Sequence, residues 1–312
     1  MRRGLGIDAG GSSTGWQLVA EDGTVLASGR TGGITGHLYR HDSTELSGEG
    51  EQTIGRLKEL LAEAGAAGKP SGVVLGAAGL DGTGPAAAQL RSLISSELGL
   101  REEAVLVDND MEIAYRGVFE PAEGVLVYAG TGSIAWHVPR SGPAIRVGGH
   151  GYLIDDAGGG FWIGRQALQH TLRWHDSLGA PSNRPLAREV YRQLGSSDWP
   201  DIRRHVYGEG RSAVAALARA VARAAARGDE TALTISRQAG TELARLANVA
   251  LQRLGVILPV GLAGGVLNLG EPLLEAFRAA LPVGCEIRIS DTDPAAAAAQ
   301  LAVRLRSADP SN

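Results

Sequence analysis

Two short stretches of the chain repeat the same turn, which is rich in glycine and hydroxyl side chains. Residues 6–16 read GIDAGGSSTGW, and residues 127–136 read VYAGTGSIAW. A strand that ends in such a turn offers free backbone N–H groups beside hydroxyl groups, which suits the binding of phosphate. The first copy carries an acid, Asp8, where the second carries Tyr128. Because Mg²⁺ takes only one or two protein carboxylates, we expect Asp8 to serve a metal ion that accompanies the phosphates.

The predicted phosphate-binding residues are those of the two turns. A tight turn without any ligand is the alternative for each loop taken by itself, and the duplication at matching positions argues against it. The residues expected to hold the phosphates of a nucleotide are Gly10, Gly11, Ser12, Ser13, Thr14, Gly130, Thr131, Gly132 and Ser133.

A second group of acids follows an apolar stretch. The sequence VLVDND ends in Asp108, Asn109 and Asp110. Carboxylates at the carboxyl end of a buried strand lie where α/β sheets bind ligands. The alternative is that these three residues only cap the next helix.

Two glycine-dense segments complete the candidate site. Residues 148–164 read GGHGYLIDDAGGGFWIG, with seven glycines around Asp155 and Asp156. So much glycine costs conformational entropy and indicates backbone that lies closely against a ligand or another domain; a capping role is the alternative for Asp156. Residues 261–268 read GLAGGVLN, where Gly264 and Gly265 would let a flat adenine ring approach the backbone. A plain strand-to-helix turn is the alternative there.

The elements that position these residues follow the same order twice. Each half begins with a three-stranded meander with glycine-bearing connections, and helices alternating with short buried strands follow. The expected helices of the first half are 51–66 and 85–98, and those of the second are 162–174, 185–195, 212–227, 230–254 and 271–281. Another helix is expected after Asp293 as its N-cap and Pro294 as its first residue. Strands alternating with helices predict an α/β protein with a sheet in each half.

Composition narrows the class of protein. The chain has 312 residues, of which 44% are hydrophobic and 21% charged, with a net charge of −4. This composition is typical of globular proteins and gives no basic excess for a nucleic-acid partner. The single cysteine, Cys285, excludes an internal disulfide or a cysteine cluster for zinc or iron–sulfur. No apolar run suits a membrane span or a signal peptide, so we expect a cytoplasmic protein without a membrane partner.

Taken together and in order, these motifs resemble those of the superfamily that contains actin and the hexokinase-type sugar kinases. Within it the chain is most similar to the N-acetylglucosamine kinase branch, also called the BadF/BadG/BcrA/BcrD ATPase family, over nearly its whole length. The resemblance implies two ribonuclease H-like α/β domains with a cleft between them. We expect the first domain at residues 1–112, completed by a C-terminal helix at 293–308, and the second at residues 113–292.

The family resemblance also implies roles for individual residues. The cofactors would be ATP and Mg²⁺, and the substrate would be a sugar, most simply N-acetylglucosamine or glucosamine. Asp110 would be the base that accepts the proton of the sugar hydroxyl. Gly264 and Gly265 would lie against the adenosine. The residues implied to bind the sugar are Asp110, Gly149, His150, Gly151 and Asp156.

The sequence departs from the family pattern at the sugar-binding positions. The family's Asn is absent from RTGGITGHLYRH, His150 stands where Trp is common, and Ala157 stands where Glu is common. A hexose kinase of other specificity therefore stays open. Two further alternatives stay open, namely a regulatory ATPase that phosphorylates no small molecule and a protein that only senses a sugar. Asp8 and Asp110 argue against the sugar sensor. The family's iron–sulfur activators need cluster cysteines, which Cys285 alone does not supply. The sequence leaves a homodimer open.

Overall fold

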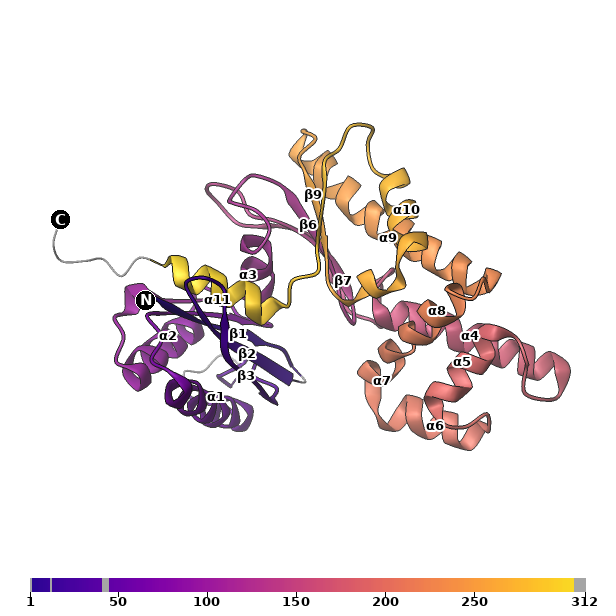
Figure 1. The fold of residues 1–312 in the computed structure, drawn as a ribbon, viewed down its shortest axis with the longest axis horizontal. Coiled ribbons are helices and arrows are strands. Elements are labelled where there is room, and N and C mark those ends of the chain that lie inside the picture. The colour runs from indigo at the N-terminus through magenta and orange to yellow at the C-terminus, as the bar shows by residue number, and fades with distance from the viewer. Residues whose placement is uncertain (1, 12, 41–44, 306–312) are drawn as a thin grey trace. The chain divides into compact units, whose positions relative to one another are not determined.

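The computed structural model describes residues 2–11, 13–40 and 45–305 (Figure 1). The chain forms two compact units, of which unit 1 is Met1–Val118 together with Thr292–Asn312 and unit 2 is Phe119–Asp291. The predicted site residue Ser12 and the predicted helical residues 306–308 lie outside the described part of the chain.

Unit 1 is built on a five-stranded sheet with the order β3-β2-β1-β4-β5. The first three strands form an antiparallel meander, and β4 and β5 run parallel to β1. Because parallel strands end at the same edge of a sheet, residues that follow β1, β4 and β5 are brought together there. The strands are β1 (Arg3–Ala9), β2 (Ser13–Ala20), β3 (Val25–Gly32), β4 (Gly72–Ala77) and β5 (Val105–Asn109).

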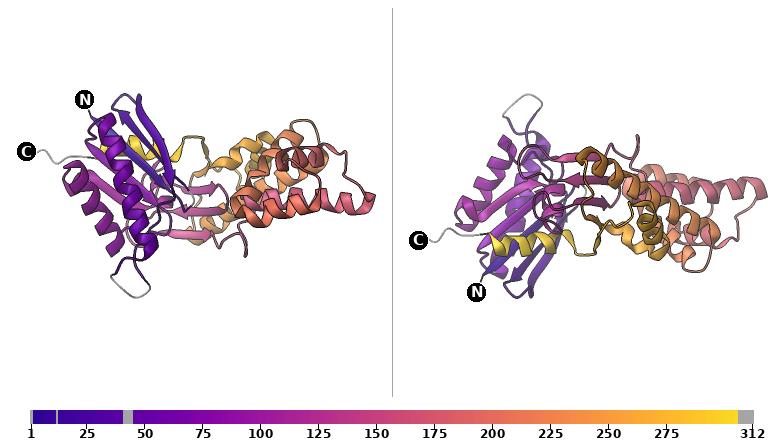
Figure 2. Two further views of the ribbon diagram at one scale, coloured as in Figure 1. Left: turned by 90° about the horizontal axis from the view of Figure 1, so that it is seen from below. Right: turned by 90° about the horizontal axis from the view of Figure 1, so that it is seen from above.

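Helices cover both faces of the sheet in unit 1. Leu75 of β4 belongs to a core that includes side chains of α1 and α2, whereas its neighbour Val74 packs with Ile113 of α3 and Ala298 of α11. Successive strand residues point to opposite faces, so the pair α3 and α11 lies opposite the pair α1 and α2, as Figure 2 shows for α11. The helices are α1 (Gly48–Ala67), α2 (Pro85–Leu98), the short 3₁₀ helix η1 (Glu102–Ala104), α3 (Asp110–Arg116) and α11 (Pro294–Arg304).

The sheet of unit 2 repeats the arrangement of unit 1. Its order is β10-β9-β6-β7-β8, with an antiparallel meander of β6, β7 and β8 and with β9 and β10 parallel to β6. The duplicated turns therefore occupy the same place in both sheets, between the first two strands of each meander. The strands are β6 (Val125–Ala129), β7 (Ser133–His137), β8 (Ile145–Gly148), β9 (Val260–Ala263) and β10 (Ile287–Ser290).

The helices of unit 2 share one large core with its sheet. Leu243 of α9 is buried together with Val127 of β6, and the same cluster continues to Val190 and Val221 in the helices between β8 and α9. No helix among residues 2–11, 13–40 and 45–305 combines the length and apolar character that a bilayer crossing requires. The helices are α4 (Gly160–Leu178), α5 (Pro185–Leu194), α6 (Trp199–Gly208), α7 (Gly210–Ala216), α8 (Ala218–Ala225), α9 (Glu230–Leu254), the 3₁₀ helix η2 (Gly265–Leu269) and α10 (Glu271–Ala280).

Most of the predicted elements are confirmed, and one helix prediction is wrong. Residues 212–227 were expected to form a single helix, but they belong to α7 and α8, which are separated at the fully buried Leu217. The alanine-rich sequence has high helix propensity on both sides of the break and therefore gives no sign of it. Helices α3 and α6 add to the predicted set. The predicted cap of the last helix is confirmed, because the Asp293 carboxylate accepts hydrogen bonds from the backbone N–H groups of Ala295 and Ala296 at 2.9 and 3.2 Å.

Candidate active site

The sheet of unit 1 brings two predicted site carboxylates together. Asp8 lies near the end of β1, and Asp110 is the first residue of α3, directly after β5. The pKa of Asp8 is raised to about 6. Burial is the largest cause, the charges of Asp110 and Asp293 add to it, and the charge of Arg30 opposes it. Asp8 and Asp110 are therefore electrostatic neighbours at one edge of the sheet.

Asp293 is a third acid at this edge, in addition to its predicted role as the cap of the last helix. Its Oδ1 atom accepts the hydrogen bonds that cap α11 and a longer one, at 3.4 Å, from the side-chain amide of Gln17. Its charge nevertheless adds to the field that raises the pKa of Asp8. In the sequence, an acid directly before Pro294 indicates only a helix cap, so nothing there predicts that Asp293 lies near Asp8. The packing of α11 on the sheet is what makes it a neighbour of Asp8.

The structure separates the roles of the acids at the end of β5. Asn109, not Asp108 or Asp110, is the N-cap of α3, and its side-chain oxygen accepts a hydrogen bond from the Met111 N–H at 2.9 Å. Asp108 accepts one from the N–H of Asn109 at 2.7 Å and packs against Gly82. Asp110 accepts a longer one from Met111 at 3.0 Å, and burial raises its pKa above the ordinary value of an aspartate. Asp110 is thus the carboxylate of this group that is placed beside Asp8.

The described residues of the first predicted phosphate turn differ in how accessible their polar groups are. The N–H of Gly10 donates to the carbonyl of Ser13 at 3.1 Å, so this amide serves the turn itself. Gly11 and Ser13 are exposed. Thr14 is fully buried and pairs with Ala9 of β1, so its side chain lies on the face of the sheet opposite to Asp8. Backbone and side-chain groups of Gly11 and Ser13 are therefore the described groups of this turn that a phosphate can reach.

The second phosphate turn is tied to the start of α4. The N–H groups of Gly160 and Phe161 donate to the carbonyls of Gly130 and Thr131 at 2.8 and 2.9 Å. The hydroxyl of Ser133 is buried and donates to the carbonyl of Ala157 at 2.8 Å. These bonds fix the turn without using the backbone N–H groups of Gly130 and Thr131. Ser133 has a structural role here that the sequence did not indicate.

Unit 2 contains a pocket beside this turn. Its volume is about 290 Å³. Gly130, Thr131 and Gly160 supply one side, residues of α7 and α8 including Arg219 supply another, and Gly265, Val266 and Asn268 of η2 complete the lining. The second phosphate turn and part of the predicted adenosine segment therefore meet in one pocket.

The two glycines of the adenosine segment have different surroundings. A Cβ atom on Gly265 would meet nothing within 4 Å, and this residue lines the pocket. Gly264 has a φ of 103°, and a Cβ atom there would lie 2.4 Å from the carbonyl oxygen of Ala129 in β6. Gly264 is thus required for close packing of the chain against β6. Gly265 is the residue that offers open space to a ligand.

The glycine-dense segment places Asp156 against the second phosphate turn. Asp156 is buried and has a φ of 54°, and its Oδ1 atom accepts a hydrogen bond from the Gly151 N–H at 3.1 Å. Its Oδ2 atom lies so close to Gly132 that a Cβ atom there would be only 2.2 Å away. Burial raises the pKa of Asp156 above its ordinary value. The Gly151 hydrogen bond and the charges of Arg211 and His150 oppose this rise without cancelling it. The structure thus brings Asp156, Gly151 and Gly132 together, and the charge of His150 also acts on Asp156.

Arg146 holds the start of the glycine-dense segment, a role that the sequence does not predict. The Arg146 side chain donates from Nε to the carbonyl of Gly148 at 3.0 Å and from Nη2 to that of Gly149 at 2.6 Å. Gly148 and Gly149 both have positive φ, at 76° and 66°. Arg146 stands at an ordinary strand position of β8, and nothing in the sequence around it signals a contact with backbone that comes after it.

The described residues contain no group of three or more His, Cys, Asp or Glu side chains arranged to hold a metal ion. A preformed metal cage is therefore absent from the described parts of both units. The predicted use of Asp8 alone needs no such cage, because Mg²⁺ takes only one or two protein carboxylates and completes its shell with water and phosphate oxygens.

Comparisons with known proteins agree on one family. The model of the BadF/BadG/BcrA/BcrD ATPase family matches residues 5–302. A protein of Clostridium acetobutylicum named N-acetylmuramic acid/N-acetylglucosamine kinase is 31% identical over 293 residues, which is 89% of this chain and 90% of that protein. The N-acetyl-D-glucosamine kinase of Dictyostelium discoideum is 27% identical over 316 residues, which is 96% of this chain and 97% of that protein.

Solved structures confirm the predicted fold. A candidate N-acetylglucosamine kinase from Chromobacterium violaceum is 27% identical, superposes with a TM-score of 0.63, and covers 97% of this chain and 99% of its own. The family resemblance and the α/β fold of the sugar-kinase type are thereby confirmed. The predicted cleft concerns both units at once and stays a prediction, as do the assigned roles of the site residues.

Proposed function

Because the chain belongs to the BadF/BadG/BcrA/BcrD ATPase family, we propose that it is an ATP-dependent kinase whose substrate is an amino hexose, N-acetylglucosamine or glucosamine. The observation that carries the proposal is the pair of Asp8 and Asp110 at one edge of the sheet in unit 1. A chain that only senses a sugar has no need of two carboxylates that repel each other. Two kinases that align along nearly the whole chain support the same conclusion.

In unit 1 we assign Asp8 to Mg²⁺ and Asp110 to the sugar hydroxyl. When bound, Mg²⁺ would neutralise charge on the phosphates of ATP. Asp110 would accept a hydrogen bond from the attacking hydroxyl, orient it and take its proton as the new bond to phosphorus forms. Burial raises the pKa of Asp110, which makes its carboxylate a stronger proton acceptor. Exposed groups of Gly11 and Ser13 would contact the phosphates.

In unit 2 we assign the pocket beside Gly130 and Thr131 to the adenosine and its phosphates, with Gly265 against the nucleoside. We assign Asp156, with the backbone from Gly149 to Gly151, to the hydroxyl groups of the sugar. A carboxylate accepts more than one hydrogen bond and so holds sugar hydroxyls well. The bond from Gly151 to Oδ1 supports this role because it fixes the orientation of the carboxylate.

A sugar-stimulated ADP release assay tests the proposal. The panel should contain N-acetylglucosamine, glucosamine, glucose and N-acetylmuramic acid, since the name of the Clostridium acetobutylicum relative includes the last of these. We expect ADP release to depend on one amino hexose and on Mg²⁺, with formation of the sugar phosphate in equal amount. ADP release that no sugar stimulates would favour the regulatory ATPase instead. Because ATP is the proposed phosphoryl donor, we propose the cytoplasm as the location.

A further inference from the structure

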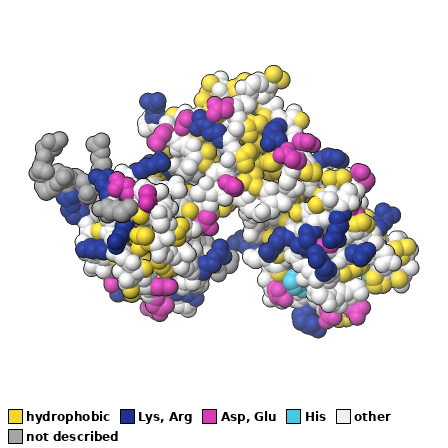
Figure 3. All heavy atoms as spheres, in the orientation of Figure 1, with side chains coloured by type: hydrophobic (Ala, Val, Ile, Leu, Met, Phe, Trp, Pro, Cys, Tyr) yellow, Lys and Arg dark blue, Asp and Glu magenta, His cyan; other side chains and the backbone are white. Residues whose placement is uncertain are grey.

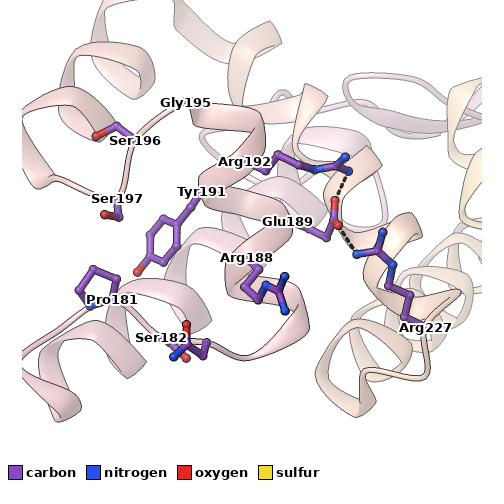
Figure 4. Close-up of a pocket in the computed structure, with 11 residues that line it drawn as sticks. Pro181, Ser182, Arg188, Glu189, Tyr191, Arg192, Gly195, Ser196, Ser197 and Arg227 are labelled. Carbon is purple, nitrogen blue, oxygen red and sulfur yellow. Dashed lines mark hydrogen bonds and ion pairs between the residues drawn. The ribbon is translucent and has the colours of Figure 1, made fainter.

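Unit 2 contains a second and larger pocket, apart from every residue assigned above. Its volume is about 640 Å³. It lies between the loop 181–183, helix α5 and the loop 195–197, and Arg227 also lines it (Figure 4). Small-molecule sites in proteins have volumes of about 300–1,000 Å³, so the pocket is large enough for a metabolite.

The wall of this pocket holds a buried carboxylate surrounded by arginines. Glu189 has only 3% of its side chain exposed, and it contacts Arg192, Arg223 and Arg227. Arg223 Nε lies 2.6 Å from Oε2, and Arg227 Nη1 lies 2.5 Å from Oε1. Burial alone would raise the pKa of Glu189, but the hydrogen bonds and charges of the arginines outweigh it and lower the pKa. One negative charge therefore faces three positive charges.

Arg188 also lines the pocket, and its side chain has no described partner. Within the part of the chain that the structure describes, the guanidinium of Arg188 makes no hydrogen bond or ion pair, and the residue is exposed. Arg192 and Arg227 are also more than half exposed, and Glu189 engages only part of their five N–H donors. Three guanidinium groups at the pocket thus keep donors that a further anion could use.

The segment around the pocket also carries an excess of positive charge. Residues 181–228 contain nine arginines and four acidic residues, although the net charge of the whole chain is −4. Figure 3 shows Lys and Arg side chains gathered over the region of α5 and α8. Within the described part of this segment, Arg192, Arg223 and Arg227 share the single carboxylate of Glu189, and Arg204 pairs with Asp201. The acidic residues of the segment therefore do not balance its arginines.

We propose that this pocket binds a small phosphorylated molecule that carries hydroxyl groups, such as a sugar phosphate. Guanidinium groups match the geometry of phosphate with paired N–H donors, and they bind it more specifically than ammonium groups do. Ser182, Tyr191 and Ser197 supply hydroxyl groups to the same pocket for the rest of the molecule. The inference goes beyond the proposed kinase activity and does not depend on it, since it rests on charge and shape alone.

Direct binding measurements test the proposal. Glucose 6-phosphate and inorganic phosphate are titrated into the full chain by calorimetry, and the same is done for Arg188→Gln. The Arg188 guanidinium makes no described hydrogen bond or ion pair, and the substitution leaves the backbone bond to Arg184 in place. The melting temperature of the unliganded variant should therefore equal that of the wild type. We expect the variant to bind glucose 6-phosphate at least about tenfold more weakly, as the loss of one charge-assisted hydrogen bond to phosphate predicts.

The matched control is Arg237→Gln, which removes an exposed arginine of α9 that does not line the pocket. It should leave the affinity for glucose 6-phosphate unchanged. We also expect glucose 6-phosphate to bind more tightly than inorganic phosphate, because only the former reaches the hydroxyl groups of the pocket. The proposal is wrong if the wild type binds neither probe at millimolar concentration, or if Arg188→Gln and Arg237→Gln bind glucose 6-phosphate equally.

Discussion

Burial and the neighbouring charge of Asp110 raise the pKa of Asp8 to about 6. The two residues are far apart in the sequence, and the parallel arrangement of β1, β4 and β5 brings them to one edge of the sheet. At neutral pH the free protein therefore holds two carboxylates that repel each other. A divalent cation would relieve this repulsion, which fits the proposed role of Asp8.

Asp8→Asn should stabilise the free protein at pH 7.5. The folded-state pKa of Asp8 lies above the ordinary 3.8, so its ionised form is disfavoured in the folded state. A difference of about two pKa units corresponds to at most about 3 kcal/mol, and partial exposure reduces this. The gain should be complete above pH 6, shrink between pH 6 and pH 4, and vanish below. Urea unfolding at several pH values measures it.

The same substitution should lower Mg²⁺-dependent ADP release strongly. A variant that is more stable but less active separates the functional role of Asp8 from any structural one. Turnover equal to that of the wild type at limiting Mg²⁺ would contradict the metal assignment, whatever the unfolding data show.

The fold could be predicted from the sequence because the local patterns of strands, turns and helices, and their repetition in the second half, indicate it. Helix α2, for example, begins at Pro85 and ends at Leu98, as its glycine and proline boundaries indicate. The acids at the end of β5 could be placed at a sheet edge because an apolar strand precedes them. The choice of Asn109 as the cap of α3 needed the structure, since Asn and Asp are both good caps.

Other parts of the site depend on tertiary contacts that leave no local signal. Helix α6 could have been recognised, because Asp198 precedes it and Pro200 lies in its first turn. The burial of Thr14 could not have been predicted. A turn rich in glycine and hydroxyl groups does not show at which residue the next strand begins to alternate between buried and exposed side chains. The hydrogen bond of Ser133 to Ala157 likewise joins segments that meet only in the folded unit.

Asp110→Asn should lower kcat by about 10²–10⁴, the range of general-base catalysis, and leave the KM for ATP nearly unchanged. Asparagine keeps the size of the side chain and one acceptor oxygen but does not take up the proton. Asp108→Asn is the internal control, because Asp108 is held by the Asn109 N–H and packs against Gly82. A larger loss of kcat for Asp108→Asn than for Asp110→Asn would show that the wrong acid was chosen.

Gly265→Val should raise the KM for ATP and leave the KM for the sugar unchanged. Gly265 lines the pocket of unit 2 and has open space beyond its Cα atom, so the new side chain would occupy volume assigned to the nucleoside. Gly264→Ala is the contrasting variant. Its Cβ atom would collide with the Ala129 carbonyl, and its φ of 103° suits only glycine, so it should lose about 1–3 kcal/mol of stability. An unchanged KM for ATP in Gly265→Val would refute the nucleoside assignment.

Arg146→Lys should raise the KM for the sugar about tenfold, because lysine keeps the charge but does not bridge the carbonyls of Gly148 and Gly149. The KM for ATP should stay the same, since Arg146 positions only the segment assigned to the sugar. Arg253→Lys is the matched control, because Arg253 contacts the backbone carbonyl of Arg146 and not the glycines. Equal changes in both KM values would indicate a general loss of structure instead.

Gly132→Ala should destabilise the protein by about 1–3 kcal/mol, the usual cost of overpacking. The three atoms nearest to the new Cβ would all belong to Asp156, the closest at 2.2 Å. Asp156→Gly removes these atoms, and glycine accepts the φ of 54° at this position without strain.

The two substitutions therefore form a cycle that tests the contact directly. In the Asp156→Gly background, Gly132→Ala should cost at least about 1 kcal/mol less than in the wild type, because its main collision is gone. Urea unfolding of the four proteins gives the coupling free energy. In the single variant Gly132→Ala, the displaced Asp156 should also raise the KM for the sugar. If Gly132→Ala costs the same in both backgrounds, Asp156 does not lie against the phosphate turn, and the link between phosphate and sugar sites in unit 2 is lost.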